Sequence, residues 1–169
     1  MRLLPPCAAL LSLAFAIPAR AYEDQLTLGV GAGYAHAASD TLPRNGALFD
    51  VSVSTGLGPV WSLRGRASYA LHPDAEPMHV ALVDAEVLYL IDVLELVPYF
   101  GIGTGAAGRV RGGELDVDPT VHVVVGLDYL ISRALTLELD ARPYLLVTEL
   151  VRAPVYFGVT AGVVWMFDG

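Results

Sequence analysis

Charged side chains recur at every second position in several segments that are otherwise apolar. Nine residues follow this spacing: Asp50, Arg64, Arg66, Asp84, Glu86, Asp128, Glu138, Asp140 and Arg142. A spacing of two places successive members on one face of a β-strand. Carboxylates and guanidinium groups that share an enclosed face must form ion pairs, because an unpaired buried charge is costly. We therefore predict a salt-bridged network that fills the interior of a closed sheet.

The balance of these charges leaves an alternative open. Six of the nine residues are acidic and three are arginine. If the shared face lined a narrow polar conduit or a binding cleft instead of a filled interior, the acidic excess would favour cations.

Few other residues have the spacing that catalysis or cofactor binding requires. The glycines of Gly29–Gly33 and Gly101–Gly105 alternate at strand spacing and precede no helix, which disfavours a dinucleotide site. The acidic segment Glu114–Asp118 lacks the glycine and terminal glutamate of a calcium loop, so we expect a solvated loop. No metal-ligand spacing links the four histidines, which are His36, His72, His79 and His122. We expect no catalytic residue, cofactor or metal site, and His122 is predicted to point inward near the outer rim.

The N-terminus has the pattern of a secretory signal. Arg2 precedes an apolar run from Cys7 to Ile17, and Ala19-Arg20-Ala21 fits the small-x-small cleavage rule. The run is too short to span a bilayer as a helix. We predict a cleaved signal peptide over residues 1–21 and one domain over 22–169, which would contain no cysteine.

Composition disfavours a nucleic-acid partner. The formal net charge is −8, and the chain contains no lysine. An acidic chain of this kind does not follow phosphate backbones. The hydrophobic fraction of 54% is high, yet the apolar residues after the signal alternate with polar ones and form no long block. Such alternation is typical of a transmembrane β-barrel.

Eight segments are predicted to be strands, and no helix-period segment competes with them. They are Gln25–His36, Ala47–Gly56, Trp61–Leu71, His79–Leu90, Val97–Gly108, Thr120–Ile131, Leu135–Val147 and Ala153–Phe167. Longer connections, including one at Arg109–Pro119, alternate with short ones, as in barrels with long outer loops and short periplasmic turns. Pro143 falls inside a strand and should mark a bulge or a weakened outer part.

The apolar faces of these segments carry aromatic residues at their two ends. If the first strand runs outward, the outer girdle is Tyr34, Phe49, Tyr69 and Phe157. The periplasmic girdle is then Trp61, Tyr89, Phe100, Tyr129, Trp165 and Phe167. Aromatic girdles at both interfaces are a property of membrane barrels. The rival interpretation, a soluble lipocalin-type barrel, would place the apolar face inside.

The signal, strand count, loop alternation, girdles and last strand resemble those of the small eight-stranded outer-membrane barrels of Gram-negative bacteria, the OmpA-barrel and OmpX-like group. The resemblance implies an all-β fold: an eight-stranded antiparallel up-and-down transmembrane β-barrel in the outer membrane. It also implies contact with outer-membrane lipid and lipopolysaccharide, and recognition by the barrel-assembly machinery through a last strand that ends in an aromatic. Phe167 fits that position, although Asp168-Gly169 follow it. We expect a monomer.

These expectations favour a non-catalytic protein with a structural or surface-interaction role. The first alternative is a narrow pore or transporter for small solutes. A weaker alternative is an enzyme that modifies outer-leaflet lipid, because some eight-stranded barrels are lipid A deacylases. Such deacylases pair histidine and serine closely on one strand face, whereas His122-Val123-Val124 lacks the serine.

Overall fold

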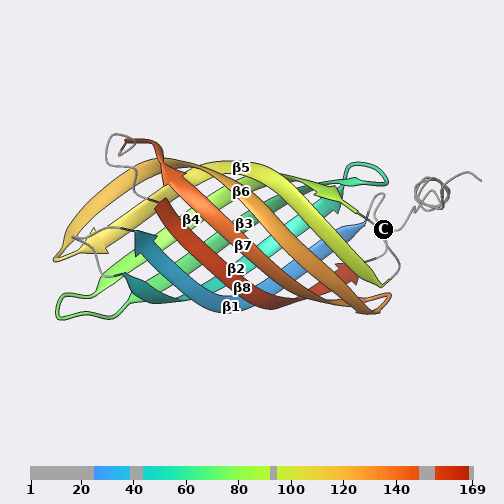
Figure 1. Cartoon of the computed structure of the whole chain (residues 1–169), viewed down its shortest axis with the longest axis horizontal. Coiled ribbons are helices and arrows are strands. Elements are labelled where there is room, and N and C mark those ends of the chain that lie inside the picture. Colours follow the sequence, from blue (N-terminus) through green and yellow to red (C-terminus); the bar gives the residue numbers. More distant parts are fainter. Residues whose placement is uncertain (1–24, 39–43, 92–94, 149–154, 168–169) are drawn as a thin grey trace, which may run out of the picture.

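The eight strands close into one antiparallel barrel (Figure 1). The computed structural model describes residues 25–38, 44–91, 95–148 and 155–167, so the predicted signal peptide lies outside it. The strands are β1 (Leu26–Ala38), β2 (Asn45–Gly56), β3 (Trp61–His72), β4 (Met78–Leu90), β5 (Leu96–Arg111), β6 (Glu114–Ser132), β7 (Leu135–Leu146) and β8 (Val155–Phe167). Within these residues no helix has the length and apolar character that a membrane crossing requires.

Each strand pairs with its sequence neighbours, and β1 pairs with β8 to close the sheet. Leu26 lies opposite Phe167, so β1 begins and β8 ends at the same end of the barrel. The eight-stranded antiparallel prediction is confirmed. Each strand has at least 12 residues, which exceeds the 9–11 or so that a tilted strand needs to cross a bilayer.

The β5–β6 connection differs from the prediction. The segment Arg109–Pro119 is not a long loop, because β5 and β6 remain paired as far as Arg111 and Glu114. The turn consists of Gly112 and Gly113, whose φ angles of 59° and 85° suit a two-residue hairpin turn that glycine adopts without strain. The predicted acidic loop Glu114–Asp118 is therefore the first part of a strand.

Pro143 does not produce the predicted bulge. It pairs in register with Phe157 of β8. On the β6 side, His122/Tyr144 and Val125/Ala141 keep the same register, but the two positions between them are unpaired, which agrees with the alternative expectation of a weakened part of the strand. The register shift lies instead between Leu130 and Ser132, near the other end of β6.

The interior of the barrel is layered. One buried apolar cluster occupies the half near the β3–β4 and β5–β6 hairpins, which we call the outer half: Ala35, Ala37, Leu48, Ala70, Met78, Val80, Leu82, Ala107, Tyr144, Leu146 and Tyr156. A second cluster lies toward the end with the termini: Leu88, Leu90, Val97, Tyr99 and Val124. Buried arginine, aspartate and glutamate side chains occupy the level between them. Alternation in the sequence does not reveal the apolar layers, because strands such as β4 are apolar on both faces.

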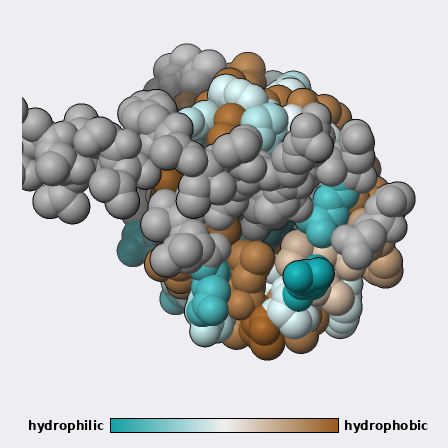
Figure 2. Space-filling model, turned by 90° about the vertical axis from the view of Figure 1, so that its right-hand side faces the viewer, coloured by the Kyte–Doolittle hydropathy of each residue, from teal (hydrophilic) through white to brown (hydrophobic). Residues whose placement is uncertain are grey.

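The outward-facing side chains are mostly apolar. Every second residue of β3 is exposed and the others are buried. Ile102 of β5, for example, is 69% exposed, and Val83 of β4 is 66% exposed. Figure 2 looks onto the end of the barrel that carries the C-terminus and shows apolar residues at its edge beside hydrophilic ones. The arrangement is inverted relative to a water-soluble barrel.

Candidate functional site

The buried charges form a network across the barrel interior, and Arg64 of β3 is its first centre. Its Nε lies 2.5 Å from Oε2 of Glu86, directly opposite in the β3–β4 ladder. Its Nη1 donates to Oε2 of Glu138 on β7 at 2.7 Å. Since β3 and β7 are four strands apart in either direction around the barrel, this ion pair spans the lumen. The Tyr99 ring lies 5.2 Å from the guanidinium carbon and adds a cation–π contact.

Arg66 and Arg142 extend the network. Arg66 Nη1 is 2.8 Å from Asp50, and its Nη2 is 2.9 Å from both Glu138 and Asp140. Arg142 Nη2 lies 2.9 Å from Asp50 and 2.9 Å from Asp140. Because Asp50, Glu138 and Asp140 are each shared between arginines, the network fixes the relative positions of β2, β3 and β7. The network is only partly satisfied, since Arg66 Nε and Arg142 Nε are buried without a hydrogen-bond partner among the described residues.

The nine predicted network residues do not all pair in the same way. Seven take part in arginine–carboxylate ion pairs: Asp50, Arg64, Arg66, Glu86, Glu138, Asp140 and Arg142. Asp84 instead accepts a hydrogen bond of 3.1 Å from the Tyr144 hydroxyl. Asp128 forms no ion pair with the residues that the structure describes, and its Oδ1 is buried without a hydrogen-bond partner.

His122 points into the barrel, as predicted, but the predicted position near the outer rim is wrong, because it lies within this network. Its Nε2 is 3.1 Å from Oε1 of Glu86, and its ring lies 4.5 Å from that of Tyr144. Its Nδ1 is 3.9 Å from Asp84. Because β6 begins at Glu114 and not near Thr120, His122 sits deep in the barrel. Gly103 provides space for the ring, since a Cβ there would collide with it.

A separate ion pair lies closer to the β5–β6 turn. Arg109 Nη2 donates to Asp118 Oδ2 at 2.6 Å, and Thr148 donates to the other oxygen of Asp118. Asp118, predicted as part of a solvated loop, is therefore buried, whereas Glu114 and Asp116 are exposed. All three acids share one face of β6, so the difference reflects their distance from the Gly112–Gly113 turn: only Asp118 is far enough along the strand to be enclosed.

The girdle residues lie on the outside of the barrel, and two of the tyrosine hydroxyls have hydrogen-bond partners. At the outer end, the Tyr34 hydroxyl donates to Asn45 at 2.5 Å, and the Tyr69 hydroxyl lies 2.5 Å from Nδ1 of His79. At the other end, Trp61 packs edge-on to Tyr89 with ring centroids 5.1 Å apart. Side chains with an apolar body and a polar tip suit a membrane–water interface.

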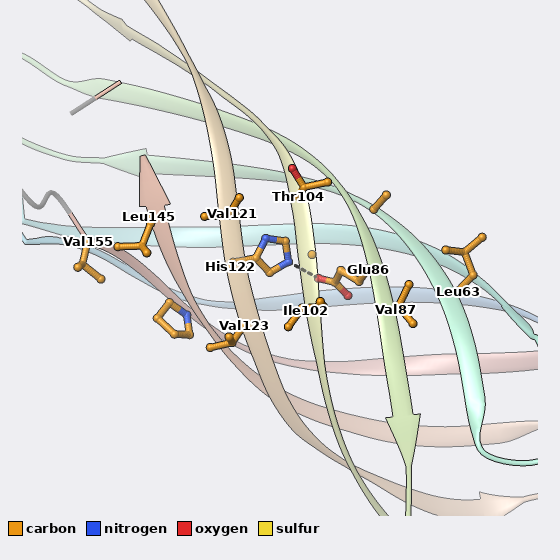
Figure 3. Close-up of a pocket in the computed structure, with 13 residues that line it drawn as sticks. Leu63, Glu86, Val87, Ile102, Thr104, Val121, His122, Val123, Leu145 and Val155 are labelled. Atoms are coloured by element: carbon orange, nitrogen blue, oxygen red, sulfur yellow. Dashed lines mark hydrogen bonds and ion pairs between the residues drawn. The ribbon is translucent and has the colours of Figure 1, made fainter. Parts of the chain in front are cut away.

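The outer surface also carries a shallow apolar groove of about 810 Å³ (Figure 3). Leu63, Val87 and Ile102 line one part, and Val121, Val123 and Leu145 line another. The groove crosses strands β3 to β8, and Figure 3 also shows the His122–Glu86 hydrogen bond next to it. Its lining is that of a surface in contact with hydrocarbon.

The described residues contain no group of three or more His, Cys, Asp or Glu side chains that could hold a metal ion.

No family model matches the chain, and no curated protein matches it. Solved structures do. The crystal structure of Neisserial surface protein A (NspA) has a TM-score of 0.74 at 15% identity and covers 86% of this chain and 100% of its own. Ail, the attachment invasion locus protein of Yersinia pestis, has a TM-score of 0.59 at 14% identity, covering 86% of this chain and 99% of its own. The outer membrane enzyme PagL has a TM-score of 0.53 at 14% identity, covering 80% of this chain and 97% of its own. The chain therefore has the fold of the small eight-stranded outer-membrane barrels.

Proposed function

We propose that this protein is a barrel of the bacterial outer membrane with a structural or surface-interaction role and no catalytic activity. The fold it shares with NspA and Ail supports the location. Exposed apolar side chains, among them Val83, Ile102 and Val125, surround the outside of the barrel and form what we call the apolar belt. This belt supports the membrane location independently, because a soluble protein rarely exposes so large a continuous apolar surface. Its partners would be outer-membrane lipid and lipopolysaccharide around the belt, and the barrel-assembly machinery at β8. We propose that the chain is exported by residues 1–21 and functions as a monomer.

The ion pairs that cross the lumen are the observation that supports a non-transport role. Arg64 and Glu138 meet across the barrel at 2.7 Å, and Arg66 meets Asp140 across it at 2.9 Å. Apolar clusters lie on either side of this charged level. An eight-stranded barrel is just wide enough for side chains to fill. This arrangement favours a closed interior over the narrow pore.

The position of His122 disfavours a lipid-modifying enzyme. PagL has the same fold and is an enzyme, so the fold alone does not decide the question. Here the histidine is buried inside the barrel and contacts Glu86, Asp84 and Tyr144. Its side chain is 0% exposed, which disfavours direct contact with a lipid in the bilayer.

The outer surface would then carry the specific interactions. Among the described residues, the β5–β6 hairpin combines exposed apolar side chains on its outer face, such as Leu115, with the exposed acids Glu114 and Asp116. Ail, which shares the fold, is an attachment invasion protein by name and was solved with a heparin analogue. Loops held on a rigid scaffold commonly carry such binding.

Fractionation and cysteine labelling test the proposal. We expect the protein in the outer-membrane fraction, with heat-modifiable migration in detergent. A Glu114→Cys variant should react with a membrane-impermeant maleimide on intact cells. The matched variant Ala134→Cys, at the exposed β6–β7 turn, should react only after the outer membrane is permeabilised. A water-soluble protein, or labelling of both variants on intact cells, would contradict the proposal.

A further inference from the structure

The ladder between β6 and β7, which we call the seam, is the one ladder that is interrupted among the described residues. The other seven ladders pair without a gap or a change of register. In the seam, two successive positions are unpaired beside Pro143, which has no N–H to donate, and the register shifts between Leu130 and Ser132. The short paired run between these two irregularities is therefore not continued by a regular ladder on either side.

Two carboxyl groups face each other within this paired run. Asp128 of β6 lies directly opposite Glu138 of β7, and like charges at opposed positions repel. Arg64 at 2.7 Å and Arg66 at 2.9 Å hold Glu138 as a carboxylate, and both arginines are shared with other carboxylates. Asp128 forms no ion pair with the described residues, and its buried Oδ1 has no hydrogen-bond partner among them. The repulsion is thus not offset at Asp128 itself.

The surroundings of Asp128 supply no further cation. Both carboxyl groups of the pair line a cavity of about 40 Å³, in which Arg64 is the only cationic side chain among the described lining residues and Tyr99 the only other titratable one. The lining side chains that β1, β2, β4 and β8 contribute are uncharged. Arg64 also binds Glu86, and Asp140 adds a further negative charge 3.8 Å from it. An ionised Asp128 would be an enclosed charge without a partner, which is costly.

We propose that Asp128 carries a proton in the folded barrel at neutral pH, and that its ionisation under alkaline conditions loosens the seam. A neutral carboxyl group avoids the uncompensated charge and can donate its O–H to an acceptor such as the opposing carboxylate. Loss of the proton places two carboxylates opposite each other in a run that is interrupted on both sides. The seam is then a pH-sensitive element of an otherwise continuous sheet. This inference goes beyond the proposed function and does not depend on it.

The pH dependence of stability tests the protonation. Aspartate in an unfolded chain ionises near pH 4, so above roughly that pH a folded barrel that keeps the proton on Asp128 binds one proton more than the unfolded chain. Stability must then fall as the pH rises. The unfolding equilibrium constant should increase by up to about tenfold per pH unit until Asp128 ionises in the folded barrel as well. Urea titrations in lipid vesicles between about pH 5 and pH 10 measure this slope.

Asp128→Asn is the matched variant, because asparagine has nearly the shape of the protonated acid and no ionisable group. Relative to this variant, the wild-type protein should lose stability as the pH rises. Asp116→Asn, at an exposed position on the β5–β6 hairpin, should keep the wild-type slope. Asp128→Ser provides a second neutral side chain if the asparagine variant folds poorly. Equal slopes in the wild type and a neutral variant at position 128, or loss of the slope in Asp116→Asn, overturn the proposal.

Spin labels on opposed positions test the loosening in a chain that retains Asp128. Leu127 and Leu139 are opposed across the seam, and Val51 and Ala67 are opposed across the uninterrupted β2–β3 ladder. Labels on cysteines introduced at these positions should move apart across the seam at the pH where the stability slope levels off, and not across β2–β3. A seam distance that stays constant through that pH, or the same change in both pairs, overturns the proposal.

Discussion

Arg64 of β3 and Glu138 of β7 are 74 residues apart in the chain and meet across the diameter of the barrel at 2.7 Å. The contact lies in a charged level between two apolar clusters. Together with the Arg66–Asp140 pair, it links opposite walls of the closed sheet directly. The ion pair therefore both stabilises the barrel and occupies the space through which a solute would pass.

Removing one carboxylate from this network should destabilise the barrel. Glu138→Gln leaves Arg64 and Arg66 with less negative charge in a buried site, and we expect a loss of about 3–5 kcal/mol in the free energy of unfolding. Urea titration in lipid vesicles, followed by the gel-mobility shift, measures it. Glu114→Gln makes the same chemical change at an exposed position and should cost no more than about 0.5 kcal/mol. Equal stability of the two variants would show that the network contributes little.

A charge on the outer face should be costly in proportion to its depth. Ile102 is 69% exposed and lies in the middle of the belt. Replacing it by arginine should lower the free energy of unfolding by about 2–4 kcal/mol. Val117→Arg, on the β5–β6 hairpin, should lower the free energy of unfolding by only about 0–1 kcal/mol. Unfolding measured in vesicles compares the two. A negligible cost at Ile102 would mean that this face is in contact with water.

Gly103 should tolerate no side chain. A Cβ at this position would collide with the His122 ring and come within 2.9 Å of the Ala85 carbonyl oxygen. We expect Gly103→Ala to destabilise the barrel by about 1–3 kcal/mol. Gly65→Ala is the matched control, since nothing lies within 4 Å of a Cβ there. If both alanine variants unfold at the same urea concentration, the packing around His122 is not as described.

The two tryptophans should report the depth of one interface. Trp61 and Trp165 are the only tryptophans in the sequence, and both lie near the end that carries the termini. Lipids brominated near the headgroup should quench their fluorescence more than lipids brominated near the bilayer centre. The single-tryptophan variants Trp61→Phe and Trp165→Phe should give the same depth profile. Stronger quenching from the bilayer centre, or two different profiles, would contradict a shared girdle.

The architecture could be predicted from the sequence because a two-residue period separates the two faces of each strand. Arg64 and Arg66 stand out in β3 because their outward neighbours Leu63 and Ala67 are apolar. The ends of β5 and β6 were harder to locate. The run from Arg109 to Pro119 is charged enough to be interpreted as a loop, although Gly112-Gly113 is itself a hairpin signal.

The pairing inside the barrel could not be predicted. Which carboxylate Arg64 reaches depends on the tilt and stagger of strands on opposite sides of the closed sheet, and a strand pattern contains neither. The apolar clusters inside the barrel could not be predicted for a different reason. Leu82 and its outward neighbour Val83 are both apolar, so alternation does not tell the inward residue from the outward one.

Planar-bilayer recording tests the closed interior most directly. The heat-modifiable, folded protein is added to a bilayer in concentrated KCl, with the heat-unfolded sample as the control. Because side chains from β3 and β7 meet in the lumen, we predict no steady unitary current from the folded protein. Reproducible single-channel steps that require the folded form would contradict the closed interior and favour a pore.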